Sequence, residues 1–134
     1  MKLQISTSLR QNLLDWAAAS PAAEICGLLL GRGDRVEQLV PARNVAADPA
    51  RSFEIDPATL LATHREARGL GLQVIGHWHS HPNGRAEPSA RDAARALDNG
   101  QIWLILAGGG CTAWRAEALG PGPARFQPVA LEAV

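Results

Sequence analysis

The strongest constraint on the fold is a continuous apolar run, Ile25 to Leu30, which lies between Glu24 and Gly31. A run with no polar side to turn toward water predicts a strand that is buried on both faces. A second run, Ile102–Ala107, is equally short. Neither approaches the roughly 18 residues that a membrane span requires, so both are expected inside a globular domain, with no membrane partner.

Signals for helices and further strands alternate along the rest of the chain. Capping residues and prolines predict three helices: from Ser6–Ser8 to near Ser20-Pro21, from Asp56-Pro57 to about Arg68, and over Ser89–Leu97, closed by Asn99-Gly100. The other expected strands are Val36–Val45, Phe53–Ile55, Leu72–Trp78, Gln101–Leu106 and Thr112–Glu117. This order predicts one α/β domain over residues 1–134, a mixed β-sheet flanked by helices, in which 119–134 forms a short C-terminal strand or tail.

Charge and cysteine content narrow the possible partners and the compartment. The chain has 13 basic and 13 acidic residues, a formal net charge of zero, and no basic stripe, so we expect no nucleic-acid partner. Arg10 and Asp15 interrupt what would be the apolar core of a signal peptide, which favours a cytoplasmic protein. Cys26 and Cys111 both lie in apolar stretches, and two buried free thiols are favoured over a disulfide, which stays open.

Three of the four histidines alternate in the stretch GHWHSHPNGRAEPSARD: His77, His79 and His81. On a strand, residues two apart share a face about 6.6 Å apart, so two imidazoles can reach one zinc ion but three would span about 13 Å. His79 and His81 stand at the end of the strand, because Pro82 follows directly. At most one adjacent pair is therefore expected to bind a metal.

A third ligand is available in Asp92, in the first turn of the helix that starts at Ser89. Ser89-Ala-Arg-Asp92 also has the pattern of a capping box, which by itself would explain both residues. Together with His79 and His81, however, the carboxylate completes a set of two histidines and one acid. Such a set leaves the fourth tetrahedral position open to water, as in catalytic zinc sites.

Other zinc-site families that contain a His-x-His motif do not match this sequence. The residues after His81 are Pro82-Asn83, which excludes the His-x-His-x-Asp-His pattern of metallo-β-lactamases. The Pro-Cys-x-x-Cys of zinc deaminases is absent from the sequence, as is the glutamate that a cupin would need shortly after the pair. Amidohydrolase barrels are typically about 250 residues, longer than these 134.

The remaining pattern is His79-Ser-His81-Pro, seven residues from His81 to Ser89, then two residues to Asp92. It resembles the signature of the JAMM (MPN-plus) metalloproteases, which is preceded at a distance by a glutamate that enters an apolar strand. Glu24-Ile-Cys-Gly-Leu-Leu-Leu-Gly31 fits that element, and Phe53-Glu-Ile-Asp-Pro57 is similar to short bacterial members. The resemblance implies the JAMM/MPN fold, which is cytidine-deaminase-like.

The resemblance also implies roles for individual residues. His79, His81 and Asp92 would hold Zn²⁺, Glu24 would serve as general base, and Ser89 would hydrogen-bond the oxyanion. The residues alone would not single out Glu24, since Glu54 and Glu87 are plausible rivals. His77 departs from the family, in which this position is commonly aromatic or apolar, and it is not expected to be a ligand.

The family implies hydrolysis of a peptide or isopeptide bond at the C-terminal Gly-Gly of a ubiquitin-like protein. The loops Val45–Ser52 and Asn83–Pro88 are short, without the long insertions of ubiquitin-specific members. This favours a bacterial form that acts on a small sulfur-carrier protein. Two alternatives stay open: an inactive MPN-type protein-binding scaffold, and a zinc hydrolase of another peptide or of a small amide.

Overall fold

The computed structural model describes residues 2–96, 100–118 and 120–134. The helices are α1 (Thr7–Ala18), α2 (Pro57–Leu70) and α3 (Ala90–Arg95). The strands are β1 (Lys2–Ile5), β2 (Cys26–Arg32), β3 (Arg35–Ala42), β4 (Gln73–Ser80), β5 (Ile102–Ala107), β6 (Gly110–Glu117) and β7 (Arg125–Ala133). Among the described residues, no helix combines the length and apolar character that crossing a bilayer would demand.

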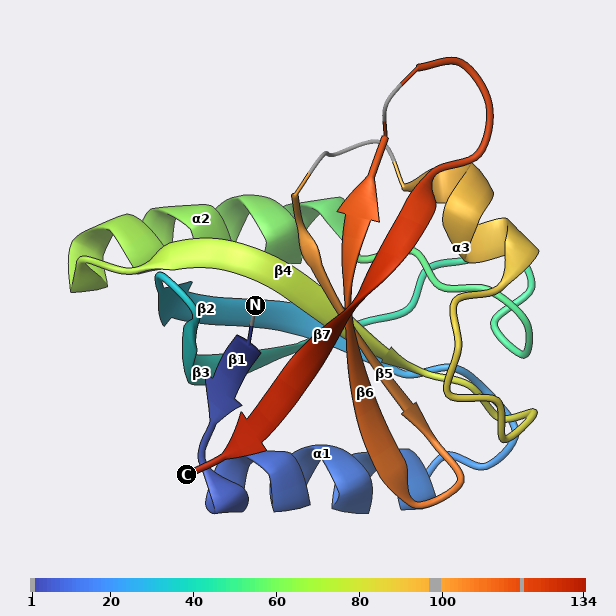
Figure 1. The fold of residues 1–134 in the computed structure, drawn as a ribbon, viewed down its shortest axis with the longest axis horizontal. Helices are drawn as coiled ribbons and strands as arrows, with labels where there is room; N and C mark the ends of the chain where they lie inside the picture. The colour runs from blue at the N-terminus through green and yellow to red at the C-terminus, as the bar shows by residue number, and fades with distance from the viewer. Residues whose placement is uncertain (1, 97–99, 119) are drawn as a thin grey trace.

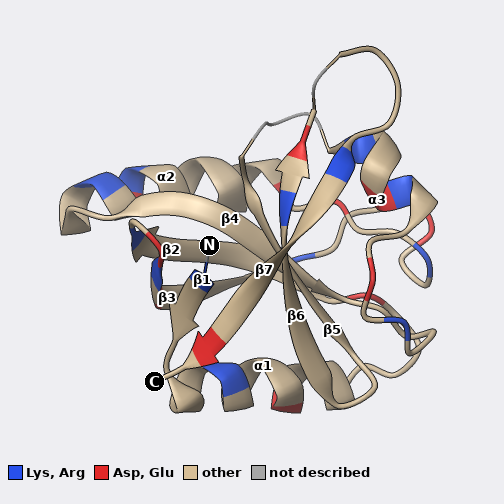
Figure 2. Cartoon of the chain, viewed as in Figure 1, with Lys and Arg blue, Asp and Glu red and all other residues tan. Residues whose placement is uncertain are grey.

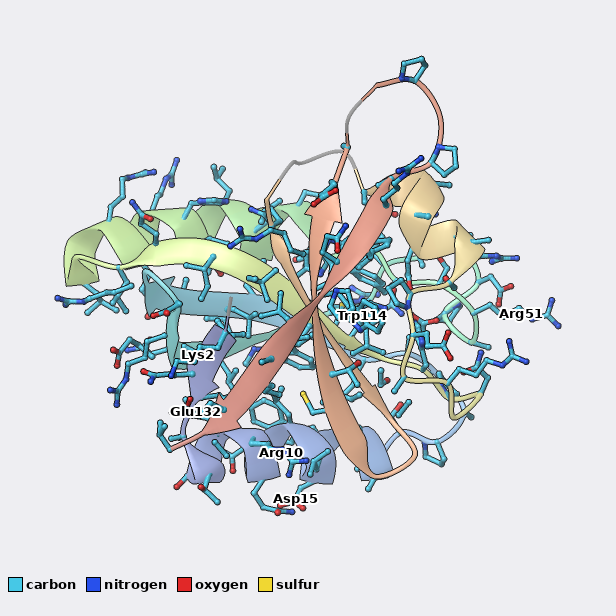
Figure 3. All side chains as sticks on the ribbon, viewed as in Figure 1. Lys2, Arg10, Asp15, Arg51, Trp114 and Glu132 are labelled. Carbon is cyan, nitrogen blue, oxygen red and sulfur yellow. The ribbon has the colours of Figure 1, made fainter. Side chains whose placement is uncertain are left out.

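The strands form one closed barrel in the order β1-β3-β2-β4-β5-β6-β7. β1 is parallel to β3 and β7, and β4 is parallel to β5, whereas the other neighbours are antiparallel. The ends of the chain close the barrel, since Lys2 pairs with Ala130 and Ile5 with Ala133. An exposed ion pair of 3.0 Å between Lys2 and Glu132 spans the same junction (Figure 3). The predicted α/β domain with a mixed sheet is confirmed.

The helices cover two different sides of the strands (Figure 1). α1 lies against β5 and β6, and its Trp16 packs on Trp78 of β4 with ring centroids 5.6 Å apart. α2 lies over β2, β3 and β4, where Ala67 packs with Leu30 and Leu72. α3 lies near the end of β4, where its Asp92 contacts His79. Charges of both signs are interspersed along helices, loops and strand ends (Figure 2).

Local sequence signals account for where the helices begin and end. The side chain of Ser6 accepts a hydrogen bond from the backbone N–H of Leu9 and so caps α1. Pro57 occupies the first turn of α2, and Gly71 ends that helix in the left-handed conformation, with φ of 68°. Ser89 and Asp92 form the capping box of α3 that the sequence predicts.

The structure corrects several predicted boundaries. Phe53–Ile55 is not a strand, because only Ile55 forms an isolated bridge, with Asn44. β4 continues to Ser80 and therefore contains His79. α3 ends at Arg95, and the predicted end at Leu97 and closure at Asn99 lie outside the described residues. β1 was not predicted, since four residues carry too little pattern to be recognised alone.

The cysteines are free thiols: Cys26 is buried in β2, and Cys111 is half-buried in β6. The disulfide that the sequence left open is not formed.

Candidate metal centre

The register between β2 and β4 brings distant residues together at one end of the barrel. The strands are antiparallel, with Cys26 opposite His79. Just beyond the ends of these strands, the same alignment brings Glu24 near His81, and their ligand atoms lie within 4.8 Å of each other. Ser80 links the two segments, because its hydroxyl accepts from the N–H of Ile25 (2.9 Å) and its own N–H donates to the carbonyl of Ile25 (3.0 Å). Backbone pairing therefore determines the separation of the glutamate and the histidine.

A structured loop returns the chain from His81 to α3 and delivers Asp92. The N–H of Gly84 donates to the carbonyl of His81 (3.1 Å), and Gly84 has a positive φ of 79° that suits glycine. Thr112 of β6 anchors the middle of the loop, since its hydroxyl donates to the carbonyl of Ala86 (2.7 Å). The loop thus fixes the start of α3 relative to the barrel.

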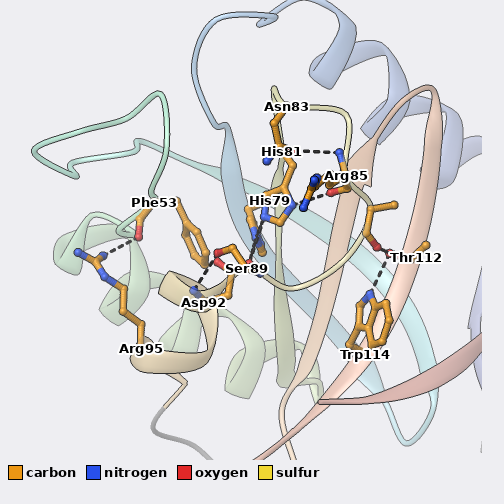
Figure 4. A network of polar contacts seen from close by, with 11 residues as sticks. Phe53, His79, His81, Asn83, Arg85, Ser89, Asp92, Arg95, Thr112 and Trp114 are labelled. Atoms are coloured by element: carbon orange, nitrogen blue, oxygen red, sulfur yellow. Dashed lines mark hydrogen bonds and ion pairs between the residues drawn. The ribbon is translucent and has the colours of Figure 1, made fainter. Parts of the chain in front are cut away.

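His79, His81 and Asp92 converge on one point (Figure 4). The Nε2 atoms of the two histidines are 2.9 Å apart, and Oδ2 of Asp92 is 3.3 Å from the first and 3.1 Å from the second. All three residues are buried, with exposed fractions of 0%, 6% and 5%. In a tetrahedral zinc site with bonds of about 2.0 Å, neighbouring ligand atoms are ~3.3 Å apart, so the triangle has the dimensions of three such ligands.

The chemistry of these atoms also fits a cation. Nδ1 of His81 lies 2.8 Å from the carbonyl oxygen of Arg85, and because a carbonyl only accepts, Nδ1 carries the proton. In the neutral form of His81, the lone pair of Nε2 is therefore directed toward His79 and Asp92. Metal-binding histidines ordinarily donate their second ring N–H in this way. A single divalent cation would satisfy all three converging acceptors, which one proton cannot do.

The shifts in pKa reflect this crowding. Burial lowers the pKa of His79. Burial acts in the same direction on His81, but hydrogen bonds to Asp92 and to the Arg85 carbonyl outweigh it, so that its pKa is raised. Burial alone would raise the pKa of Asp92, yet hydrogen bonds with both histidines hold it far below its ordinary range. Asp92 is thus a carboxylate at every physiological pH, and it also caps α3 through the Ser89 N–H at 2.9 Å. The capping box and the convergence on the histidines are compatible.

Glu24 lies beside the triangle without joining it. Glu24, His79 and His81 each offer a ligand atom, and these atoms lie within 4.8 Å of one another. Within the described residues, Oε1 of Glu24 has no hydrogen-bond partner, although the residue is only 6% exposed. Burial raises the pKa of Glu24 to about 7, with His81 opposing and Asp92 reinforcing the shift. A carboxyl group with this pKa can both accept and release a proton near neutral pH.

The opening onto this arrangement is a cavity of about 390 Å³. Its walls come from four segments of the chain: residue 24, residues 50–51, the turn after β4, and the start of α3. The lining residues are Glu24, Ala50, Arg51, His81, Pro82, Asn83, Ser89, Ala90 and Arg91. Ser89 faces this cavity, and its hydroxyl oxygen accepts from the Asp92 N–H (3.0 Å), which leaves the hydroxyl proton free to be donated.

The five candidate residues lie together at this end of the barrel: Glu24, His79, His81, Ser89 and Asp92. The alternative glutamates lie in different surroundings. Glu54 and Glu87 are both exposed. His77 lies on the same face of β4 as His79, but its ring packs edge-on against Trp103 at 4.3 Å. Burial lowers the pKa of His77 to about 3, so it is a neutral member of an aromatic cluster.

Two contacts at the site were not foreseen in the sequence. The ring of Phe53 stacks on His79, with centroids 4.2 Å apart and planes 21° apart. Ser80 makes the two bonds to Ile25 described above. The position of Ser80 between the histidines was a usable signal for its role, whereas nothing local to Phe53 indicates which ring it contacts.

The chain is similar to known proteins of one family. The family described as prokaryotic homologs of the JAB domain matches residues 6–117. A desampylase of Haloferax volcanii is 34% identical over 110 residues, which are 78% of this chain and 79% of that protein. A probable TtuB-protein conjugate cleaving protease of Thermus thermophilus is 39% identical over 70 residues, covering 52% of this chain and 47% of that protein.

Structural similarity extends over nearly the whole chain. A JAB1/MPN domain protein from Archaeoglobus fulgidus superposes with a TM-score of 0.63 over 99% of this chain and 97% of its own, at 22% identity. This likeness shows the JAB/MPN fold, as the sequence resemblance implied. Since the family match covers most of the chain and a relative above 30% identity covers more than three quarters of it, the chain belongs to the prokaryotic JAB-domain homologues, within the JAMM/MPN family.

Proposed function

We propose that this protein is a zinc metallopeptidase that cleaves a peptide or isopeptide bond after the C-terminal Gly-Gly of a ubiquitin-like or sulfur-carrier protein. The observation that carries the proposal is the buried triangle of His79, His81 and Asp92, with an unpartnered Glu24 carboxyl group beside it. Membership of the JAMM/MPN family and the name of the Haloferax relative, a desampylase, support the hydrolase class.

His79, His81 and Asp92 would hold the zinc ion through Nε2, Nε2 and Oδ2. Bound zinc would supply Lewis acidity, which lowers the pKa of a coordinated water and polarises a carbonyl group. The Arg85 carbonyl holds the proton on Nδ1 of His81, so the neutral form of this imidazole offers Nε2 as the ligating nitrogen. The three side chains are almost inaccessible to solvent, so bulk water does not compete for the same positions.

Glu24 is the proposed general base and later general acid. Its carboxyl group is close to the histidines but makes no hydrogen bond to them within the described residues, so one oxygen is available to a water molecule. It would take a proton from the attacking water at Oε1 and return a proton to the leaving amine. The raised pKa favours both transfers, because a group that titrates near neutral pH exchanges protons with little driving force in either direction.

Ser89 is proposed to stabilise the oxyanion. The hydroxyl oxygen already accepts from the Asp92 N–H, so its orientation is fixed while its proton can be donated into the cavity. A donor aimed at the position where charge develops lowers the barrier in acyl transfer. The cap of α3 therefore does two things: it orders the helix that carries Asp92, and it orients this donor.

The form of the cavity supports a small, extended substrate segment. Ala50 and Ala90 line it with short side chains, and no long insertion separates its walls. A Gly-Gly tail has no side chains to accommodate and so fits a narrow opening. The names of the two relatives, a desampylase and a probable protease of TtuB-protein conjugates, support a ubiquitin-like or sulfur-carrier protein as substrate. Free Cys26 and Cys111 agree with a reducing, cytoplasmic setting.

The test uses sulfur-carrier fusions that extend beyond Gly-Gly, incubated with zinc-loaded protein and with chelated protein. We expect roughly one equivalent of zinc per chain and zinc-dependent release of the extension at Gly-Gly. A matched fusion with Ala-Ala in place of Gly-Gly should resist cleavage. Zinc below about a tenth of an equivalent that added zinc does not restore would overturn the enzyme in favour of a binding scaffold. Cleavage of unrelated peptides only would favour a different zinc hydrolase.

A further inference from the structure

Asn44, just beyond the end of β3, makes an unusually complete set of side-chain hydrogen bonds. Its Nδ2 donates to the carbonyl oxygens of Glu24 (2.9 Å) and Ser52 (3.1 Å). Its Oδ1 accepts from the backbone N–H groups of Ala46 (3.0 Å) and Glu54 (3.1 Å). An amide side chain has two donor hydrogens and two acceptor lone pairs, so Asn44 uses its full capacity.

The bond to Glu24 completes the attachment of that residue's backbone. The N–H of Glu24 donates to the carbonyl of Pro49 (2.7 Å), and its carbonyl accepts from Asn44. Pro49 belongs to the loop between Asn44 and Phe53, whose start is tied to Asn44 through the N–H of Ala46. Asn44 therefore holds Glu24 directly and also holds the loop that binds Glu24 from the other side.

The remaining two bonds bracket Phe53. Asn44 binds the carbonyl of Ser52 and the N–H of Glu54, the residues on either side of Phe53 in the chain. The ring of Phe53 stacks on His79 at 4.2 Å, and the Phe53 carbonyl accepts from Arg95 of α3 at 2.9 Å. Asn44 is thus the common attachment of the Glu24 backbone and of the segment that carries Phe53.

We propose that Asn44 is a positioning residue that sets Glu24 and Phe53 at their working distances from the histidine pair. The expected effect on kcat rests on the proposed function, whereas the effect on the backbone at Glu24 does not. Asn44 has no contact with His79, His81 or Asp92 among its four bonds, so it acts through Glu24 and Phe53 rather than on the metal.

The kinetic test compares Asn44→Ala with wild type on the Gly-Gly fusion, at saturating zinc. A small displacement of a catalytic group is costly, so we expect kcat to fall about 30- to 100-fold while KM changes by less than about threefold. In a Glu24→Gln background the same change should cost less than about threefold, because the Glu24 carboxylate, the positioned group that transfers the proton, is already lost. An equal loss in both backgrounds would contradict positioning through Glu24.

Two further variants separate positioning from general destabilisation. Asn44→Asp keeps the two accepted bonds but presents a carboxylate oxygen to the carbonyls of Glu24 and Ser52, so it should lose kcat as Asn44→Ala does. Thr63→Ala is the control, since it removes a part-buried hydrogen bond elsewhere, from the hydroxyl of buried Thr63 to the Thr59 carbonyl (2.7 Å) within α2. It should lower the melting temperature and leave kcat unchanged. A loss of kcat in Thr63→Ala equal to that in Asn44→Ala would overturn the proposal.

An activity-free measurement keeps the inference testable if the proposed substrate is wrong. Amide hydrogen exchange of metal-free protein, followed by NMR, should accelerate at least about tenfold in Asn44→Ala at Glu24, Ala46 and Glu54. The amides of Leu28–Leu30 in β2 should not change. Unchanged exchange at Glu24 would overturn the positioning role, whatever the enzyme cleaves. If exchange accelerates in Asn44→Ala but the wild-type protein cleaves no fusion, the positioning role is supported and only the proposed substrate is rejected.

Discussion

Both faces of strand β4 are buried, but their surroundings differ. Trp78 points into the apolar core with Leu29 and Leu104, while the next residue, His79, points to Asp92 on the other face. The two side chains are equally buried, with exposed fractions of 1% and 0%. Alternation along a strand separates these environments by one residue.

The two faces are stabilised in opposite ways. On the core face, burial of apolar surface favours the folded state directly. On the other face, Glu24, His79, His81 and Asp92 are ionisable side chains held away from water, which is unfavourable unless each finds a partner. A bound cation would be the partner of the converging nitrogens and carboxylate. The contrast indicates that one face maintains the fold and the other maintains the chemistry, and substitutions should separate the two.

Glu24→Gln is expected to have the largest effect, and on activity alone. Removing a general base typically costs 10²- to 10⁴-fold, so kcat on the Gly-Gly fusion should fall about 10³-fold. Zinc content should stay at one equivalent, because the amide leaves His79, His81 and Asp92 untouched. Activity assays and metal analysis of one preparation check both statements. Full activity in a zinc-loaded variant would show that another group takes the proton.

Leu104→Ala should do the reverse, with its effect on stability. Leu104 is fully buried in the core face, and truncation of such a residue costs about 3 kcal/mol of unfolding free energy. If the two faces of β4 are independent, saturating zinc should raise the melting temperature of the variant and of wild type by the same amount. Thermal unfolding with and without chelator measures this. A smaller zinc-dependent increase in the variant would mean that the two faces are coupled.

The pH dependence of stability should differ between metal-free wild type and Glu24→Gln. The pKa of Glu24 is raised to about 7 in the folded protein from 4.5, so folding favours the protonated form. Its stabilising effect is complete below the unfolded value and is lost as pH rises toward 7. Wild type should therefore lose about 2 kcal/mol relative to the glutamine variant between pH 4.5 and 7. Denaturant unfolding across this range tests it, and parallel curves would contradict the burial of the carboxyl group.

His77→Phe should have the smallest effect. His77 is uncharged, its Nδ1 is buried without a partner within the described residues, and its neighbours are the rings of Phe53 and Trp103. Replacement by phenylalanine should change the unfolding free energy by less than about 1 kcal/mol and leave zinc affinity within about threefold. Isothermal titration with zinc checks the second statement. A large loss of affinity would show that His77 takes part in binding the metal.

Much of the site could be predicted from local pattern, because local physics governs those parts. The spacing of His79 and His81 indicated one strand face, although the strand proved longer than expected and contains His79. Ser89 and Asp92 form the capping box that their spacing predicts. By contrast, Phe53–Ile55 has the residues of a strand but is not one, since the side chain of Asn44 takes the N–H of Glu54 that a ladder partner would have bound. A competing side chain of this kind leaves no local signal.

The residue types of the site, the strand face of the histidines and the helix cap that carries Asp92 can all be read from local sequence, since each depends on neighbours a few positions apart. The proximity of Glu24 to His81 arises from tertiary structure, because the register of β2 on β4 brings both residues to the same end of the barrel. Tertiary structure also decided that β1 and β7 close the barrel, and that Asn44 joins Glu24 to the segment of Phe53. These contacts depend on how segments far apart in the chain align, and strand register is set by the packing of the whole core rather than by any single segment.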